Sequence, residues 1–199
     1  MSRLRITALF AAMALLASPL LTATESQGAD ADAAARARAE AAASALGSTL
    51  KQALQARMLS EGPLAAVDFC HQQAQPLTAK VAAEHGVRLG RIGVRNRNAQ
   101  NALGGWQHAA LEAMATTYDA SLTPPPASAQ RSADGTQLNY ARAIRTEGPC
   151  LLCHGTNINE NLLAAIRQRY PDDTATGFTE GELRGLLWVE VPLGDVGTN

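Results

Sequence analysis

The chain has 199 residues, a formal net charge of −1, 46% hydrophobic and 4% aromatic residues, and three cysteines. This length predicts one domain with an N-terminal extension, and the weakly acidic balance excludes nucleic-acid binding, which needs a concentrated basic face. Because alanine is abundant and aromatic residues are few, the side chains alone would make a thin core, and we expect something bulky to complete it.

Residues 1–24 have the layout of a secretory signal peptide: two arginines, an apolar run and then small residues. A membrane anchor is the alternative, but Pro19 interrupts the run, which is shorter than the ~20 apolar residues of a spanning helix. We therefore expect cleavage, a periplasmic protein and no stable membrane anchor afterwards. Loss of Arg3 and Arg5 moves the net charge from −1 to −3.

The next part of the chain favours helices. Residues 25–45 are rich in alanine, arginine and acid and carry no large apolar residue, which predicts an exposed helical lead-in or a frayed tail. From Leu46 to Met58, apolar residues recur at helical spacing. A second helix is expected from Pro63, a suitable first-turn residue, to Gly86, and Pro76 is expected to kink it.

Strands and helices alternate in the remainder. Residues 87–97 predict a strand, residues 106–122 a helix, and Asp134-Gly135 a hairpin turn between two strands. Residues 157–170 predict a short helix, and the segment from Gly185 is the clearest strand in the chain. The predicted class is therefore α+β, with an antiparallel sheet packed against N-terminal helices.

Between the last two strands lies "GPCLLCHG", which contains Cys150, Cys153 and His154. The pattern C-x-x-C-H is the attachment site of c-type haem: each thiol forms a thioether with one vinyl group, and the histidine binds the iron. A redox-active disulfide is an alternative, but it normally opens a helix after a strand in a βαβ unit. A structural zinc site would need a second pair of ligands. We therefore predict one covalent haem c, which would also complete the core.

The second axial ligand remains open when only residue types are considered. Cys70 is the third cysteine, it faces the inner side of its predicted helix, and Ala66 and Ala74 lie one turn away on either side. A buried, inert cysteine is the alternative interpretation. The other candidate ligands are histidines and methionines, namely His71, His85, His108, Met58 and Met114.

Several segments in this order resemble a known family: "VDFCHQQA" (67–74), "HGVRLGR" (85–91), "RNAQN" (97–101), "CLLCHG" (150–155) and "YPDDTATGF" with "ELRG" (170–185). The family is the Tll-type family of bacterial exported c-type haem proteins with a PAS-like fold. The resemblance covers roughly residues 45–193 and implies a PAS-like c-type haem domain over 46–199. It implies Cys150 and Cys153 as thioether anchors, His154 as the proximal ligand and Cys70 as the distal ligand.

Such ligation has functional consequences. A coordinated thiol is deprotonated, and its negative charge favours ferric iron, which predicts a low reduction potential. Because both axial positions are filled, we expect electron transfer or redox signalling with a partner protein, and no enzyme. The alternative is a haem-based gas or redox sensor in which Cys70 is displaced on reduction. Arg91 and Arg97 are candidates for contacts to the haem propionates.

Overall fold

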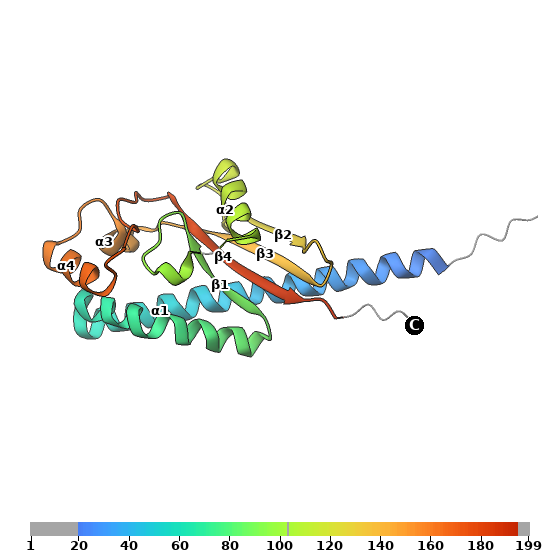
Figure 1. The fold of residues 1–199 in the computed structure, drawn as a ribbon, viewed down its shortest axis with the longest axis horizontal. Helices are drawn as coiled ribbons and strands as arrows, with labels where there is room; N and C mark the ends of the chain where they lie inside the picture. The colour runs from blue at the N-terminus through green and yellow to red at the C-terminus, as the bar shows by residue number, and fades with distance from the viewer. Residues whose placement is uncertain (1–19, 103, 195–199) are drawn as a thin grey trace, which may run out of the picture.

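The longest element of the computed structural model, which describes residues 20–102 and 104–194, is the helix α1 (Leu20–His85). Gly62, at φ 84°, breaks it into two arms, residues 20–61 and 63–85, and Pro63 begins the second arm. Figure 1 shows the arms lying side by side as a helical hairpin. The predicted start at Pro63 is confirmed, and the second arm keeps helical backbone angles through Pro76.

In the described part of the chain, four strands form one antiparallel sheet with the order β1-β4-β3-β2. The strands are β1 (Arg88–Gly93), β2 (Ala127–Arg131), β3 (Gln137–Arg145) and β4 (Leu183–Pro192). The predicted turn at Asp134-Gly135 joins β2 to β3. The predicted α+β class with an antiparallel sheet is confirmed.

The shorter helices surround this sheet. They are η1 (Ala99–Asn101), α2 (Trp106–Thr117), η2 (Gly148–Cys150), α3 (Leu151–His154) and α4 (Glu160–Arg169). Figure 1 shows α1 along one face of the sheet and α2 on the other. The helix α4 packs against α1 near the hairpin turn. The helices η2, α3 and α4 all lie between β3 and β4 in the chain. The C-x-x-C-H segment is part of η2 and α3.

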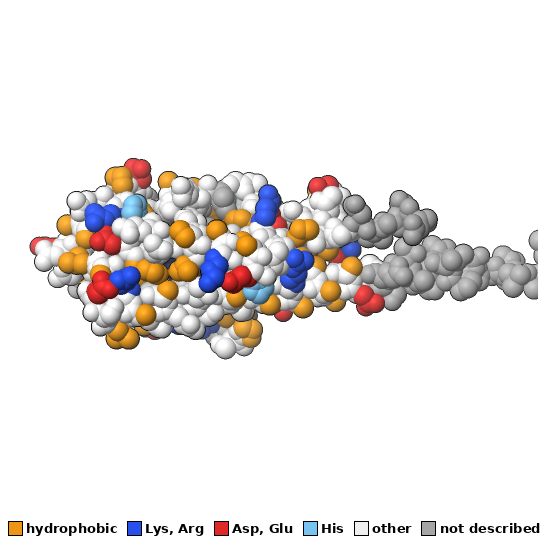
Figure 2. All heavy atoms as spheres, turned by 90° about the horizontal axis from the view of Figure 1, so that it is seen from below, with side chains coloured by type: hydrophobic (Ala, Val, Ile, Leu, Met, Phe, Trp, Pro, Cys, Tyr) orange, Lys and Arg blue, Asp and Glu red, His pale blue; other side chains and the backbone are white. Residues whose placement is uncertain are grey.

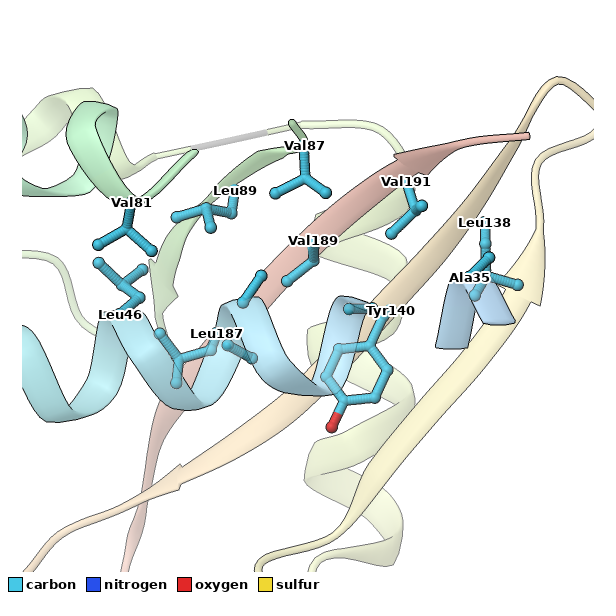
Figure 3. Close-up of a cluster of buried hydrophobic side chains, with 13 residues drawn as sticks. Ala35, Leu46, Val81, Val87, Leu89, Leu138, Tyr140, Leu187, Val189 and Val191 are labelled. Atoms are coloured by element: carbon cyan, nitrogen blue, oxygen red, sulfur yellow. The ribbon is translucent and has the colours of Figure 1, made fainter. Parts of the chain in front are cut away.

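The core between α1 and the sheet depends on alanine. Ala35, Ala39, Ala42 and Ala43 are buried, and the helix backbone lies close to bulky strand residues (Figure 3). These strand residues include Leu138, Tyr140, Leu187, Val189 and Val191. The prediction that residues 25–45 form an exposed lead-in is therefore wrong for their second half. The small alanine side chains let the α1 backbone lie close to the sheet, and the large side chains of the strands fill the core between them.

The opposite face of the sheet has its own core beneath α2, formed by residues such as Leu111, Met114 and Leu186. A buried carboxylate lies at its edge. Glu190 is 3% exposed and accepts hydrogen bonds from the Trp106 indole (2.7 Å) and the Gln107 amide (3.1 Å). Arg88 forms an ion pair with the same carboxylate. Every charge in this region therefore has a partner within the protein.

The predicted signal peptide lies mostly outside the described residues, which begin at Leu20. Among the helices that are described, none combines the length and the apolar character that a membrane crossing requires. Figure 2 shows one face of the described surface, where basic and acidic side chains are interspersed and form no continuous basic patch.

Candidate functional site

The C-x-x-C-H segment forms one helical turn between β3 and β4. Pro149 lies in η2, and α3 continues the turn through His154. Helical spacing places residues three and four apart on the same side, so Cys150, Cys153 and His154 share one face. Gly155 ends the turn, and a Cβ atom there would lie 2.5 Å from the Leu151 carbonyl oxygen. Both cysteines are free thiols.

Hydrogen bonds fix the state of the His154 ring. Its Nδ1 lies 2.6 Å from the Ala175 carbonyl oxygen, which can only accept, so Nδ1 carries the proton. Its Nε2 lies 3.0 Å from Arg184 Nη2, which can only donate, so Nε2 presents a lone pair. Burial, together with the charges of Arg184 and Arg97, lowers the pKa of His154 well below its usual value. The ring is neutral and oriented as a metal-ligating histidine requires.

Cys70 reaches the same site from the second arm of α1. The side chains one turn away are small, since Ala66 is buried and Ala74 is half-buried. Burial raises the pKa of the Cys70 thiol, and the positive charges of Arg91, Arg97 and Arg184 oppose this shift. Burial also raises the pKa of Cys153, and the Cys70 charge adds to that increase. Cys70 is half-buried, and Cys153 packs in one cluster with Val67, which lies one turn before Cys70 on α1.

Arg97 holds the motif in place. Its guanidinium donates to the Cys153 carbonyl oxygen at 2.6 Å and forms an ion pair with Asp173 at 3.1 Å. Both side chains are largely buried, at 13% and 4% exposed. Asp173 also accepts from the Ala175 backbone N–H at 2.8 Å, which positions the carbonyl that binds His154. Arg97 thus has its partners within the protein, whereas the Arg91 side chain makes no hydrogen bond or ion pair in the described part of the chain.

Arg184 is a site residue that sequence reasoning missed. The pairing of β3 with β4 shifts register between Ile144 and Arg145, so that Arg145 pairs with Leu183 and Ile144 with Gly185. The extra residue at this bulge is Arg184, and bulges redirect side chains in this way. A glycine inside a strand is the sequence signal for such a bulge, and Gly185 follows directly.

Two neighbours, Gly185 and Phe178, determine where the Arg184 side chain points. A Cβ atom on Gly185 would lie 2.0 Å from the Ile92 carbonyl oxygen, so only glycine fits between β4 and β1. The Phe178 ring, 1% exposed, lies between two guanidiniums, with Arg95 3.8 Å and Arg184 5.2 Å from the ring centroid. Arg184 Nη1 is buried and has no hydrogen-bond partner among the described residues.

A hollow of about 380 Å³ opens beside Arg97. Its wall comes from α1, the 97–100 segment and the end of α4, and includes His71, Arg97 and Tyr170. Burial raises the pKa of Tyr170 to about 12, and the Cys70 charge contributes to this increase. Within 20–102 and 104–194, no three His, Cys, Asp or Glu side chains converge on one point as the ligands of a single ion would.

The other candidate ligands lie apart from the motif or face solvent. His71 is exposed and makes an edge contact with Tyr170, with ring centroids 5.1 Å apart. His108 is exposed beside Glu112, and Met114 is buried under α2 on the far face of the sheet. Met58 lies near the hairpin turn, and His85 is in the last turn of α1. Among the candidates, Cys70 is the residue whose charge acts on the pKa of a motif cysteine, Cys153.

The fold and the site together define an α+β protein in which a helical hairpin presents a thiol to a C-x-x-C-H turn beside three arginines. The chain belongs to the Tll0287-like family, whose model matches residues 24–192. Its fold is similar to the crystal structure of the cyanobacterial heme-protein Tll0287, at 24% sequence identity and a TM-score of 0.52. That match covers 88% of this chain and 97% of the other. No curated protein matches the chain.

Proposed function

We propose that this chain is a c-type haem protein with one covalently bound haem. Cys150 and Cys153 would form the two thioether bonds, and His154 Nε2 and Cys70 Sγ would bind the iron. The observation that carries the proposal is that Cys153 of the C-x-x-C-H turn packs in one cluster with Val67, which lies one turn before Cys70, the third cysteine of the chain, on α1. The printed title of the similar crystal structure describes a heme-protein, which supports the cofactor class.

The residues present fit such a group. The Nε2 atom of His154 presents its lone pair because Ala175 holds the proton on Nδ1. Ala66 and Ala74, one turn from Cys70 on either side, are small side chains, which suits the close approach of a flat ring. The bound iron supplies a one-electron redox couple. Because burial raises the pKa of the Cys70 thiol, this thiol is protonated at neutral pH until a metal ion replaces its proton.

We assign the protein to electron transfer or redox signalling in the periplasm, with a redox partner protein and no catalytic role. A thiolate ligand stabilises the ferric state, so the potential is low, and two filled axial positions leave no open site for substrate chemistry. We also propose that the fold is PAS-like, as the sequence resemblance implies. The second candidate is a sensor in which Cys70 leaves the iron on reduction, and the raised thiol pKa favours protonation of a released Cys70.

Covalent attachment is the direct test. Protein produced with a c-type haem maturation system is expected to keep its pigment through acidic organic extraction and to give a c-type pyridine haemochrome spectrum. The double variant Cys150→Ala/Cys153→Ala is expected to lose all covalent pigment. Cys70→Ala is the matched control, because it removes the third cysteine and leaves both thioether positions intact. Wild-type protein that is colourless, or whose pigment is extracted, contradicts the proposal.

Carbon monoxide separates the two candidate functions. Ferrous protein that retains Cys70 on the iron does not bind carbon monoxide rapidly, which is the result expected for an electron carrier. Rapid binding by the wild-type protein, at a rate similar to that of Cys70→Ala, identifies ligand release on reduction and supports the sensor. The measurement is the absorbance change after mixing dithionite-reduced protein with carbon monoxide.

A further inference from the structure

The helix α4 packs against the part of α1 that carries Cys70. Val67 lies one turn before Cys70 on α1 and is 4% exposed. It packs in one cluster with three buried residues that are spaced one turn apart on α4 and at its end, namely Leu162, Ile166 and Tyr170. Residues at this spacing share one face of a helix. One face of α4 therefore contacts the turn of α1 that precedes Cys70.

Two further contacts flank Cys70 directly. Arg169 Nε donates to Asp68 Oδ1 at 2.6 Å. The rings of His71 and Tyr170 meet edge to face, with their centroids 5.1 Å apart. Because the Asp68–Arg169 pair is partly exposed, it contributes little energy alone and mainly fixes orientation. Asp68 precedes Cys70 by two residues and His71 follows it, so the end of α4 holds α1 on both sides of the thiol.

The same helix is attached to the C-x-x-C-H turn. Cys153 packs against the cluster that contains Val67. Residues 155–159 alone separate the turn from α4, and the Asn159 side chain caps the start of that helix. The helix α4 therefore contacts both halves of the candidate site, the Cys70 segment and the motif.

The rest of the second arm of α1 is attached elsewhere. Val81, 2% exposed, packs in the cluster between α1 and the sheet. At the end of this arm, Arg38 donates to the carbonyl oxygens of His85 at 2.7 Å and Gly86 at 2.6 Å. The sheet and Arg38 thus hold the last part of the arm, whereas α4 holds the turns around Cys70.

We propose that α4 is the positioning element for Cys70, and that Cys70 leaves the iron only when the contact between α4 and residues 67–71 opens. This proposal rests on the proposed function, in which Cys70 is the distal ligand. Truncation of the Val67 side chain leaves a cavity in this contact, which destabilises the closed arrangement relative to the open one. An added ligand competes with Cys70 for the iron, so its apparent affinity rises with the open fraction.

Imidazole binding to the ferric, haem-loaded protein, followed by absorbance, tests this role of α4. Val67→Ala and Val81→Ala are a matched pair, because both remove the same atoms from a buried valine on the same arm of α1. We expect Val67→Ala to raise the apparent affinity for imidazole about tenfold and Val81→Ala to leave it unchanged. Equal affinities in the two variants overturn the proposal, because a merely structural loss of packing affects both.

A surface variant decides the question if Val67→Ala does not fold. Arg169→Gln removes the ion pair with Asp68 and is expected to raise the imidazole affinity about twofold. Arg167→Gln, at an exposed position on the same helix, loses the same charge and is expected to have no effect. The absence of any difference between the two arginine variants then overturns the proposal.

Failure of the proposed function is recognised separately. It fails if the wild-type protein is colourless, or if Cys70→Ser binds imidazole no more tightly than wild type. The rate at which the Cys70 thiol reacts with Ellman's reagent, measured in Cys150→Ala/Cys153→Ala, then tests the position of Cys70 alone. Val67→Ala in this background is expected to increase the rate about tenfold, whereas Val81→Ala is expected to leave it unchanged. Equal rates for the two valine variants overturn the proposal in the protein without haem.

Discussion

Glu190 and Arg184 are both charged residues of β4, but their surroundings differ. The buried Glu190 carboxylate accepts from Trp106 and Gln107 and pairs with Arg88, so the protein itself supplies all of its partners. At the other end of the strand, Arg184 has one nitrogen without a partner and another against a candidate metal ligand. A buried carboxylate whose partners are all supplied by the protein contributes to stability, whereas an unsatisfied guanidinium beside a candidate metal ligand indicates where a ligand binds.

The substitution Gly185→Ala tests whether the bulge joins these two regions, and we expect the largest loss of stability here. The new Cβ atom would lie 2.0 Å from the Ile92 carbonyl oxygen, so β4 must move away from β1. The expected cost is about 3 kcal/mol, with an altered haem absorption spectrum because Arg184, which contacts His154, changes direction. Gly194→Ala is the control, since no atom lies near its added Cβ. Equal urea midpoints for the two variants contradict this role of the bulge.

Glu190→Gln tests the buried carboxylate whose partners all come from the protein. An amide group would face Arg88 where a carboxylate now pairs with it, and the Trp106 and Gln107 donors lose their charged acceptor. We expect a loss of about 2 kcal/mol in the free energy of unfolding, measured with urea. The haem absorption and EPR spectra are expected to remain those of the wild type. A spectral change without loss of stability shows that the two regions are not separate.

Ala39→Leu tests the close contact of α1 with the sheet, also away from the site. Ala39 is 0% exposed, so a larger side chain pushes the helix away from the strands. The expected destabilisation is about 1.5 kcal/mol. The matched variant Ala33→Leu places the same side chain on the exposed side of α1 and is expected to have no comparable effect. Similar melting temperatures for the two variants contradict the close packing of this arm.

The smallest expected effect is at the β2–β3 turn, far along the sheet from the motif. Hydrogen bonds from the Ser132 hydroxyl and the Thr136 backbone and hydroxyl groups lower the pKa of Asp134 from 3.8 to about 2. A lowered folded-state pKa stabilises the protein above the unfolded value, and this contribution is lost as the pH falls from about 4 to about 2. The melting temperature of Asp134→Asn is expected to lie slightly below wild type at pH 6 and to converge with it near pH 2. A constant difference across this range contradicts the assignment.

The parts of the structure that the sequence predicted depend on local chemistry. Gly62 and Pro63 break α1, Asp134-Gly135 forms the hairpin turn, and the helical phase directs Cys70 inward. Arg184 could not be found in this way, because its direction depends on the register of two strands and on a contact with His154 from another element. The burial of Ala39 and its neighbours was missed for a related reason. The sequence shows that these side chains are small, but it does not show how closely the sheet approaches the helix that carries them.

The central claim is that Cys70 and His154 bind haem iron from opposite sides. EPR and absorption spectra of the ferric wild-type protein, compared with those of Cys70→Ser, test it most directly. We predict that the thiolate features of the wild type disappear in Cys70→Ser while the covalent haem remains attached. Identical spectra from the two proteins would contradict the claim and direct the search for the second ligand to the exposed histidines His71 and His108.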